Sequence, residues 1–140
     1  MYFQRINDSD PEKVFIRVKN SMSTDMAVGE VCVFDYTTDA DGIGVITPTT
    51  ALLPAVAGIT AAAITAGNYG AAQAYGHNAD ALVSGGTNVS AGDQLAAKNA
   101  VTNLIKAGGT LNDAEKAFFV AGEAFTTSTA AAKKVFVRCL

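Results

Sequence analysis

The stretch that decides the fold is a turn followed directly by a strand: Ala27-Val28-Gly29-Glu30, then Val31-Cys32-Val33-Phe34-Asp35-Tyr36. Glycine reaches a positive φ without steric cost, and the acidic or amide side chain after it can bond back to the turn. The same order of residue types returns in two further stretches, Thr65-Ala66-Gly67-Asn68 and Ser90-Ala91-Gly92-Asp93. We therefore expect three turns of similar geometry, each of which begins a strand. Their spacing, 38 and then 25 residues, is too uneven for a solenoid repeat.

Strand patterns lie on both sides of these turns. In the segment 13–19, Val14, Ile16 and Val18 fall on one face, and the basic residues Lys13, Arg17 and Lys19 fall on the other. Further strands are expected at 31–36, 43–47, 56–59, 62–64, 69–75, 79–83, 94–97 and 101–106, and a hairpin is expected to join 118–125 to 134–140. Helix signals are limited to one turn within 51–66 and one or two turns within 110–117. The sequence predicts a mainly β fold, a small β-barrel or β-sandwich with at most one or two short helices.

The composition fits one folded domain with an N-terminal extension. The 140 residues are 49% hydrophobic and 16% charged, which suffices for a single core. Turn-forming residues fill Asn7-Asp8-Ser9-Asp10-Pro11, so residues 1–11 are expected to lack regular structure. We expect an extended arm over 1–12 and a single β-rich domain over 13–140.

Charge and hydropathy exclude several functional classes. Ten Lys and Arg residues against 13 Asp and Glu residues give a net charge of −3, which disfavours binding to nucleic acid. Glycine and proline interrupt the weakly charged stretch 43–92, so we expect no membrane span. The N-terminus lacks the layout of a secretory signal, and synthesis in the cytoplasm of a host is expected. Two cysteines, Cys32 and Cys139, are too few for a disulfide framework or a metal cluster.

Few residues offer chemistry. His77 is the only imidazole, and it lies in the turn-like context Tyr75-Gly76-His77-Asn78 without any nucleophile signature. Asp39 and Asp41 resemble the start of a calcium loop, but no glutamate closes it at the expected distance. We therefore expect a protein that is not an enzyme, without catalytic residues, cofactor or metal.

Three motifs, in order along residues 14–140, carry a resemblance to a known family. They are the entry Asn20…Gly29-Glu30-Val31, the turn Ala66-Gly67-Asn68-Tyr69-Gly70 and the closing Gly122-Glu123-Ala124. With these motifs the sequence resembles the small capsid decoration (cement) proteins of tailed bacteriophages. The acidic arm over 1–12 departs from the usual pattern of that family.

The resemblance implies a structural virion protein on the capsid exterior. It implies a compact β-rich domain that binds the major capsid protein and stabilises the shell, commonly as a homotrimer, with no catalytic site. We expect Tyr2, Phe3, Arg5 and Ile6 of the arm to contact the capsid. Two alternatives stay open, a structural protein of a phage tail or fibre base and a small carbohydrate-binding module.

Overall fold

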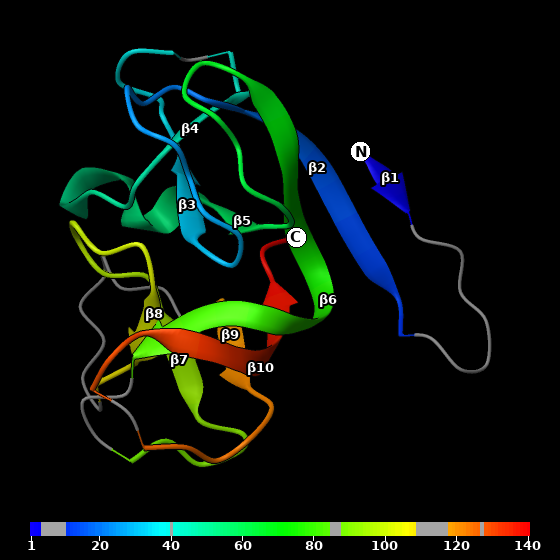
Figure 1. The fold of residues 1–140 in the computed structure, drawn as a ribbon, viewed down its shortest axis with the longest axis vertical. Coiled ribbons are helices and arrows are strands. Elements are labelled where there is room, and N and C mark those ends of the chain that lie inside the picture. The colour runs from blue at the N-terminus through cyan, green and yellow to red at the C-terminus, as the bar shows by residue number, and fades with distance from the viewer. Residues whose placement is uncertain (4–10, 40, 85–87, 109–117, 127) are drawn as a thin grey trace.

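Strands dominate the computed structural model, which describes residues 1–3, 11–39, 41–84, 88–108, 118–126 and 128–140 (Figure 1). The strands are β1 (Tyr2–Phe3), β2 (Lys13–Asn20), β3 (Val31–Phe34), β4 (Gly44–Ile46), β5 (Val56–Thr60), β6 (Tyr69–Ser84), β7 (Gln94–Ala96), β8 (Leu104–Lys106), β9 (Phe119–Ala121) and β10 (Ala131–Arg138). Within these ranges the only helix is the 3-10 helix η1 (Thr50–Ala55). The predicted mainly β fold is confirmed, and so is the single helical turn within 51–66. The helix predicted within 110–117 lies outside the described residues.

The strands close into two small barrels that share β6. In the first barrel, the pairings run β2–β4–β3–β5–β6 and return from β6 to β2. In the second barrel, they run β6–β8–β7–β9–β10 and return from β10 to β6. Figure 1 shows the two barrels one above the other, with β6 passing along both. Because the ladder closes on itself in both barrels, every barrel strand has a partner on each side, and β1 pairs with the part of the outer edge of β2 that β4 does not cover.

The second barrel repeats the topology of the first. Each barrel has one parallel pairing, β2–β4 in the first and β6–β8 in the second, and all its other pairings are antiparallel. Each also has one isolated bridge, Met26–Ile64 in the first and Val89–Phe125 in the second. Corresponding residues lie about 60 residues apart, for example Met26 and Val89. The chain is therefore an internal duplication at the level of structure.

The three predicted turns are confirmed, and the duplication explains their uneven spacing. Gly29, Gly67 and Gly92 all have positive φ, at 82°, 73° and 90°. The carboxylate of Glu30 accepts a hydrogen bond from the amide of Ala27, and that of Asp93 accepts one from the amide of Ser90. These two turns are equivalent in the two barrels, whereas the turn at Gly67 precedes β6 at the end of the first barrel. The structural repeat therefore relates the turn at Gly29 to the turn at Gly92.

Strand β6 corrects one prediction. Residues 69–75 and 79–83 were expected to form separate strands joined by a turn, but they form one strand of 16 residues. Gly76 has a φ of 100°, and the ladder shifts register on each side of it, opposite Val14/Phe15 of β2 and opposite Lys133/Val135 of β10. The turn-like residues therefore make bulges, which let one strand bend from the first barrel into the second.

The space between the barrels is as apolar as their interiors. Alternate residues of β3 point in opposite directions: Cys32 belongs to the core of the first barrel, whereas Val31 and Val33 pack with core residues of the second. All residues of β5 are buried for the same reason. Strands with both faces covered are continuously hydrophobic instead of alternating. Leu52 and Leu53 of η1 also belong to this larger core.

The C-terminal hairpin is confirmed with different bounds. β9 and β10 pair in antiparallel register, with Val135 opposite Ala121, and Val135 and Val137 are buried while Phe136 and Arg138 are exposed. The first strand of the hairpin, β9, ends at Ala121, before the predicted end at residue 125, because Phe125 forms a bridge with Val89 and not with β10.

Strand β3 ends at Phe34, two residues earlier than predicted, because the next side chain makes a turn. The carboxylate of Asp35 accepts hydrogen bonds from the amide of Thr37 at 3.1 Å and the amide of Thr38 at 3.2 Å, and from both threonine hydroxyls. The hydroxyl bonds from Thr38 and Thr37 are the main cause that lowers the pKa of Asp35, against a smaller effect of burial.

The Asp35 turn predicts a dependence of stability on pH. Because the pKa of Asp35 is lower in the folded chain than in the unfolded chain, its contribution is present at neutral pH. That contribution is lost as the pH falls below about 4 and through the lowered value. We expect Asp35→Asn to be less stable than the wild type at pH 7, by a difference that narrows toward pH 3. Urea unfolding curves between pH 7 and 3 measure this difference, and a constant difference would contradict the assignment.

Candidate interaction surface

The predicted contact arm begins as a strand. Tyr2 and Phe3 form β1 and pair with β2, with Tyr2 opposite Phe15. The two rings stack, with centroids 5.0 Å apart and an interplanar angle of 12°. The expectation that residues 1–11 lack regular structure is therefore wrong for these two residues, because the edge of β2 offers them backbone partners. Arg5 and Ile6 lie outside the described residues.

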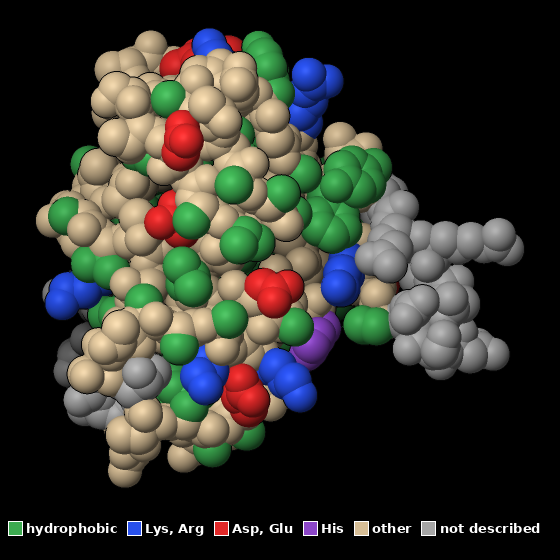
Figure 2. Space-filling view, in the orientation of Figure 1, with side chains coloured by type: hydrophobic (Ala, Val, Ile, Leu, Met, Phe, Trp, Pro, Cys, Tyr) green, Lys and Arg blue, Asp and Glu red, His purple; other side chains and the backbone are tan. Residues whose placement is uncertain are grey.

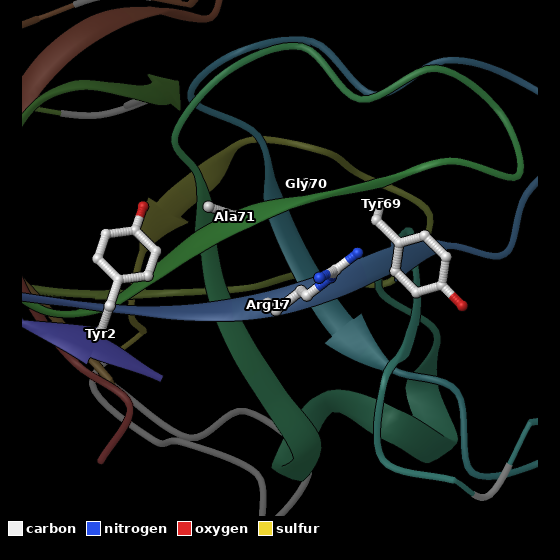
Figure 3. A pocket seen from close by; sticks show the side chains of 5 residues that line it. All are labelled: Tyr2, Arg17, Tyr69, Gly70 and Ala71. Atoms are coloured by element: carbon white, nitrogen blue, oxygen red, sulfur yellow. The ribbon is translucent and has the colours of Figure 1, made fainter.

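An open groove lies on the outside of the first barrel, next to β1. It has a volume of about 380 Å³ and is lined by Tyr2, Arg17, Tyr69, Gly70 and Ala71, which we call the outer groove. Tyr2 and Tyr69 stand at opposite ends, and Arg17 extends between them toward Tyr69 (Figure 3). The Arg17 guanidinium carbon lies 4.7 Å from the centre of the Tyr69 ring, within the range of a cation–π contact.

The outer groove is open over β6 because the β6 residues that line it, Gly70 and Ala71, have no bulky side chains. Ala71 is opposite Arg17 in the β2–β6 ladder, where a larger side chain would fill the space. A side chain at Gly70 would point away from the groove into the core, since its Cβ would lie 2.5 Å from the side chain of Ile64. In Figure 2, hydrophobic side chains gather where β1 and β2 lie in Figure 1, with basic side chains above and below them.

A second hollow lies on the other side of Tyr2, and its buried amide side chains are engaged. It has a volume of about 300 Å³, and Lys13, Gln73, Asn78 and Asp80 are among its lining residues. The Gln73 amide donates to the carbonyls of Tyr75 and His77 and accepts a hydrogen bond from Asn78. These bonds join the two bulges of β6. Because the buried amides bond to each other and to the backbone, they serve the bend of the strand.

The residues considered for chemistry lie in a strand and in a turn of the first barrel. His77 lies within β6, where Phe136 is its partner in the ladder. The carboxylate of Asp41 accepts hydrogen bonds from the amides of Ile43 and Gly44, which lower its pKa, so it closes a turn. Within the described ranges, no three His, Cys, Asp or Glu residues group as metal ligands, and no helix is long and apolar enough to cross a bilayer.

Both cysteines are free, and burial raises the pKa of Cys32 and of Cys139 to about 12. Thiolate is the reactive form, so we expect iodoacetamide at pH 8 to label the folded chain far more slowly than the chain unfolded in urea. Mass spectrometry of timed samples measures both rates. Labelling of the folded chain at the rate of the unfolded chain would contradict this burial.

Comparison with known proteins yields a structural likeness. The sequence matches no family model and no curated protein. Among solved structures, the fold is similar to the N base of the head fiber gp8.5 of bacteriophage phi29, with a TM-score of 0.53 and 12% sequence identity. The match covers 91% of this chain and 95% of that chain. The two proteins therefore share a fold across both barrels.

Two residues of the outer groove stood out in the sequence, Tyr2 as part of the arm that is expected to contact the capsid and Arg17 on the solvent face of the strand expected over 13–19. The sequence did not bring Tyr69 to them. That step requires the β2–β6 register, in which Lys19 lies opposite Tyr69. The alternation of basic and hydrophobic residues along β2 was the available signal for an exposed face.

Proposed function

We propose that this protein is a structural component of a phage particle. It binds the outer surface of the capsid as a homotrimer and stabilises the shell through contacts with the major capsid protein. The observation that carries the proposal is the fold likeness to the base of a phage head fiber, which extends over nearly all of both chains. The resemblance of the sequence to capsid decoration proteins agrees with it.

The stabilisation follows from linkage. A protein that binds only the assembled shell lowers the free energy of that state and leaves the free subunits unchanged. Three linked copies that engage the shell together raise the effective affinity without any new kind of contact. Such a protein requires exposed surfaces and a rigid body, and two barrels that share a strand supply both.

A base for a fibre is the second candidate. It is favoured by the same structural neighbour, which is the N base of a head fiber. In that case the chain would also hold on to a capsid or a tail, but its purpose would be to carry a further protein.

Pelleting tests the proposal. Purified protein is mixed with empty capsids, and separately with purified tails, of the phage that encodes it, and each mixture is centrifuged. We expect saturable recovery with capsids, a trimer by light scattering, and capsids that disrupt at a higher temperature when decorated. Recovery with tails alone would favour the tail alternative, and recovery with neither would overturn the proposal.

A further inference from the structure

We propose that the outer groove is the capsid-binding site and that it takes an extended segment of the shell protein that carries a carboxylate. This inference rests on the proposed function and names the partner chemistry for one surface of the first barrel. The charge, the shape and the backbone edge of the groove each point to this partner.

The charge of the groove comes from the Arg17 guanidinium, which has no acidic partner among the residues that the structure describes. Arg17 is exposed and stacks on Tyr69. The described residues form a single ion pair, between Lys106 and Asp93, and Arg17 takes no part in it. Stacking fixes the plane of the guanidinium and leaves its N–H groups at the edge free to bind a carboxylate through two parallel bonds. Lys13 and Lys19 lie on the same face of β2 and add positive charge on both sides.

The shape of the groove suits an extended chain. Tyr2 and Tyr69 are 52% and 54% exposed, so two aromatic rings at its ends present apolar area to a partner. The floor over Ala71 is open and mostly apolar. A segment with an acidic residue between two apolar residues would place the carboxylate on Arg17 and the apolar side chains beside the rings.

None of the described strands covers the outer backbone edge of β2 beside Arg17. The outer edge of β2 is the one opposite β6. On this edge the backbone N–H of Lys19 donates to the carbonyl of Ile43, and Phe15 pairs with Tyr2. By the alternation of a strand, the N–H and C=O of Arg17 face this edge too. Neither β1 nor β4 has a residue in register with Arg17. An extended segment can therefore bond to the backbone there, as in β-strand addition.

A second copy of this chain is a poorer source for the carboxylate. Most described acidic side chains already accept hydrogen bonds within their own chain, as Asp25, Asp35, Glu30, Asp41, Asp93 and Glu123 do. The Arg17 guanidinium pairs with no carboxylate of the described ranges, and the shell protein, as the other component of the complex, is the occupant that supplies one.

Charge reversal at Arg17 tests the inference. Capsid affinity is measured by pelleting for the wild type, Arg17→Glu, Arg17→Lys and the control Lys98→Glu, which makes the same charge change at an exposed residue of the second barrel. Losing a charged hydrogen-bonded pair weakens binding by about tenfold to a hundredfold. We expect at least a tenfold loss for Arg17→Glu, a smaller loss for Arg17→Lys, and less than a twofold change for Lys98→Glu. Equal thermal unfolding of all four proteins verifies that they are folded.

The outcomes separate the inference from the proposed function. If the wild type fails to bind capsids, the proposed function is wrong. If the wild type binds and Arg17→Glu binds equally well, the groove is not the site, and the proposed function stands. If Arg17→Glu keeps its capsid affinity but changes the oligomer mass, a second copy occupies the groove and the inference is overturned.

Discussion

Replacing Gly29 by alanine is expected to destabilise the protein by about 3 kcal/mol or more. Gly29 has a φ of 82°, which costs an L-residue about 1–2 kcal/mol. Its Cβ would also lie 2.0 Å from the carbonyl oxygen of Asp80, a backbone atom of β6. The turn cannot move away cheaply, because Gly29 accepts a hydrogen bond from Leu82 and donates one to Thr60. Chemical denaturation measures the loss in free energy of unfolding.

The duplication provides a matched control at Gly92. This residue occupies the same turn of the second barrel with a φ of 90°, but a Cβ there meets nothing within 4 Å. Gly92→Ala should therefore cost only the conformational strain of about 1–2 kcal/mol. The effect of the substitution on the unfolded chain is the same at both sites, so the difference isolates the contact with β6. Equal losses for the two variants would contradict the close approach of the first turn to β6.

Replacing Gln73 by leucine is expected to cost about 3 kcal/mol. The side chain is 2% exposed and serves three partners, the carbonyls of Tyr75 and His77 and the amide of Asn78. Leucine has a similar size but no polar atoms, so each of these buried groups would lose a bond, at about 1–3 kcal/mol for a group left unsatisfied. The loss falls on the bend of β6, where the two barrels join.

Gln94→Leu is the control for this substitution. Gln94 is exposed on β7, so the same change should alter stability by no more than about 0.5 kcal/mol. Thermal unfolding followed by circular dichroism compares the two variants. If Gln73→Leu were as stable as Gln94→Leu, the amide network would not hold the bulges of β6.

Local signals in the sequence were sufficient for the turns and for most strands. Gly29, Gly67 and Gly92 stand where backbone conformation requires glycine, and the alternation in β2 places its valines inward. These features depend on residues close together in the chain. The continuity of β6 could not be read in this way, because Gly76, His77 and Asn78 have the composition of a turn whether the chain reverses or bulges.

The duplication and the groove depend on contacts between distant residues. The two barrels share their turn at Gly29 and Gly92 but not a common pattern of strand residues, so similarity of sequence does not reveal the repeat. β3 and β5 are buried on both faces because the second barrel covers them, which no property of β3 or β5 alone specifies. The outer groove likewise requires β1, β2 and β6 to meet before Tyr2, Arg17 and Tyr69 become neighbours.

Electron cryomicroscopy of capsids incubated with the protein tests most directly whether the protein acts by covering a shell. We predict density for both barrels at symmetry-related positions on the outer surface, in groups of three, with the edge formed by β1 and β2 against the major capsid protein. Capsids with a bare outer surface after incubation with saturating protein would contradict the account.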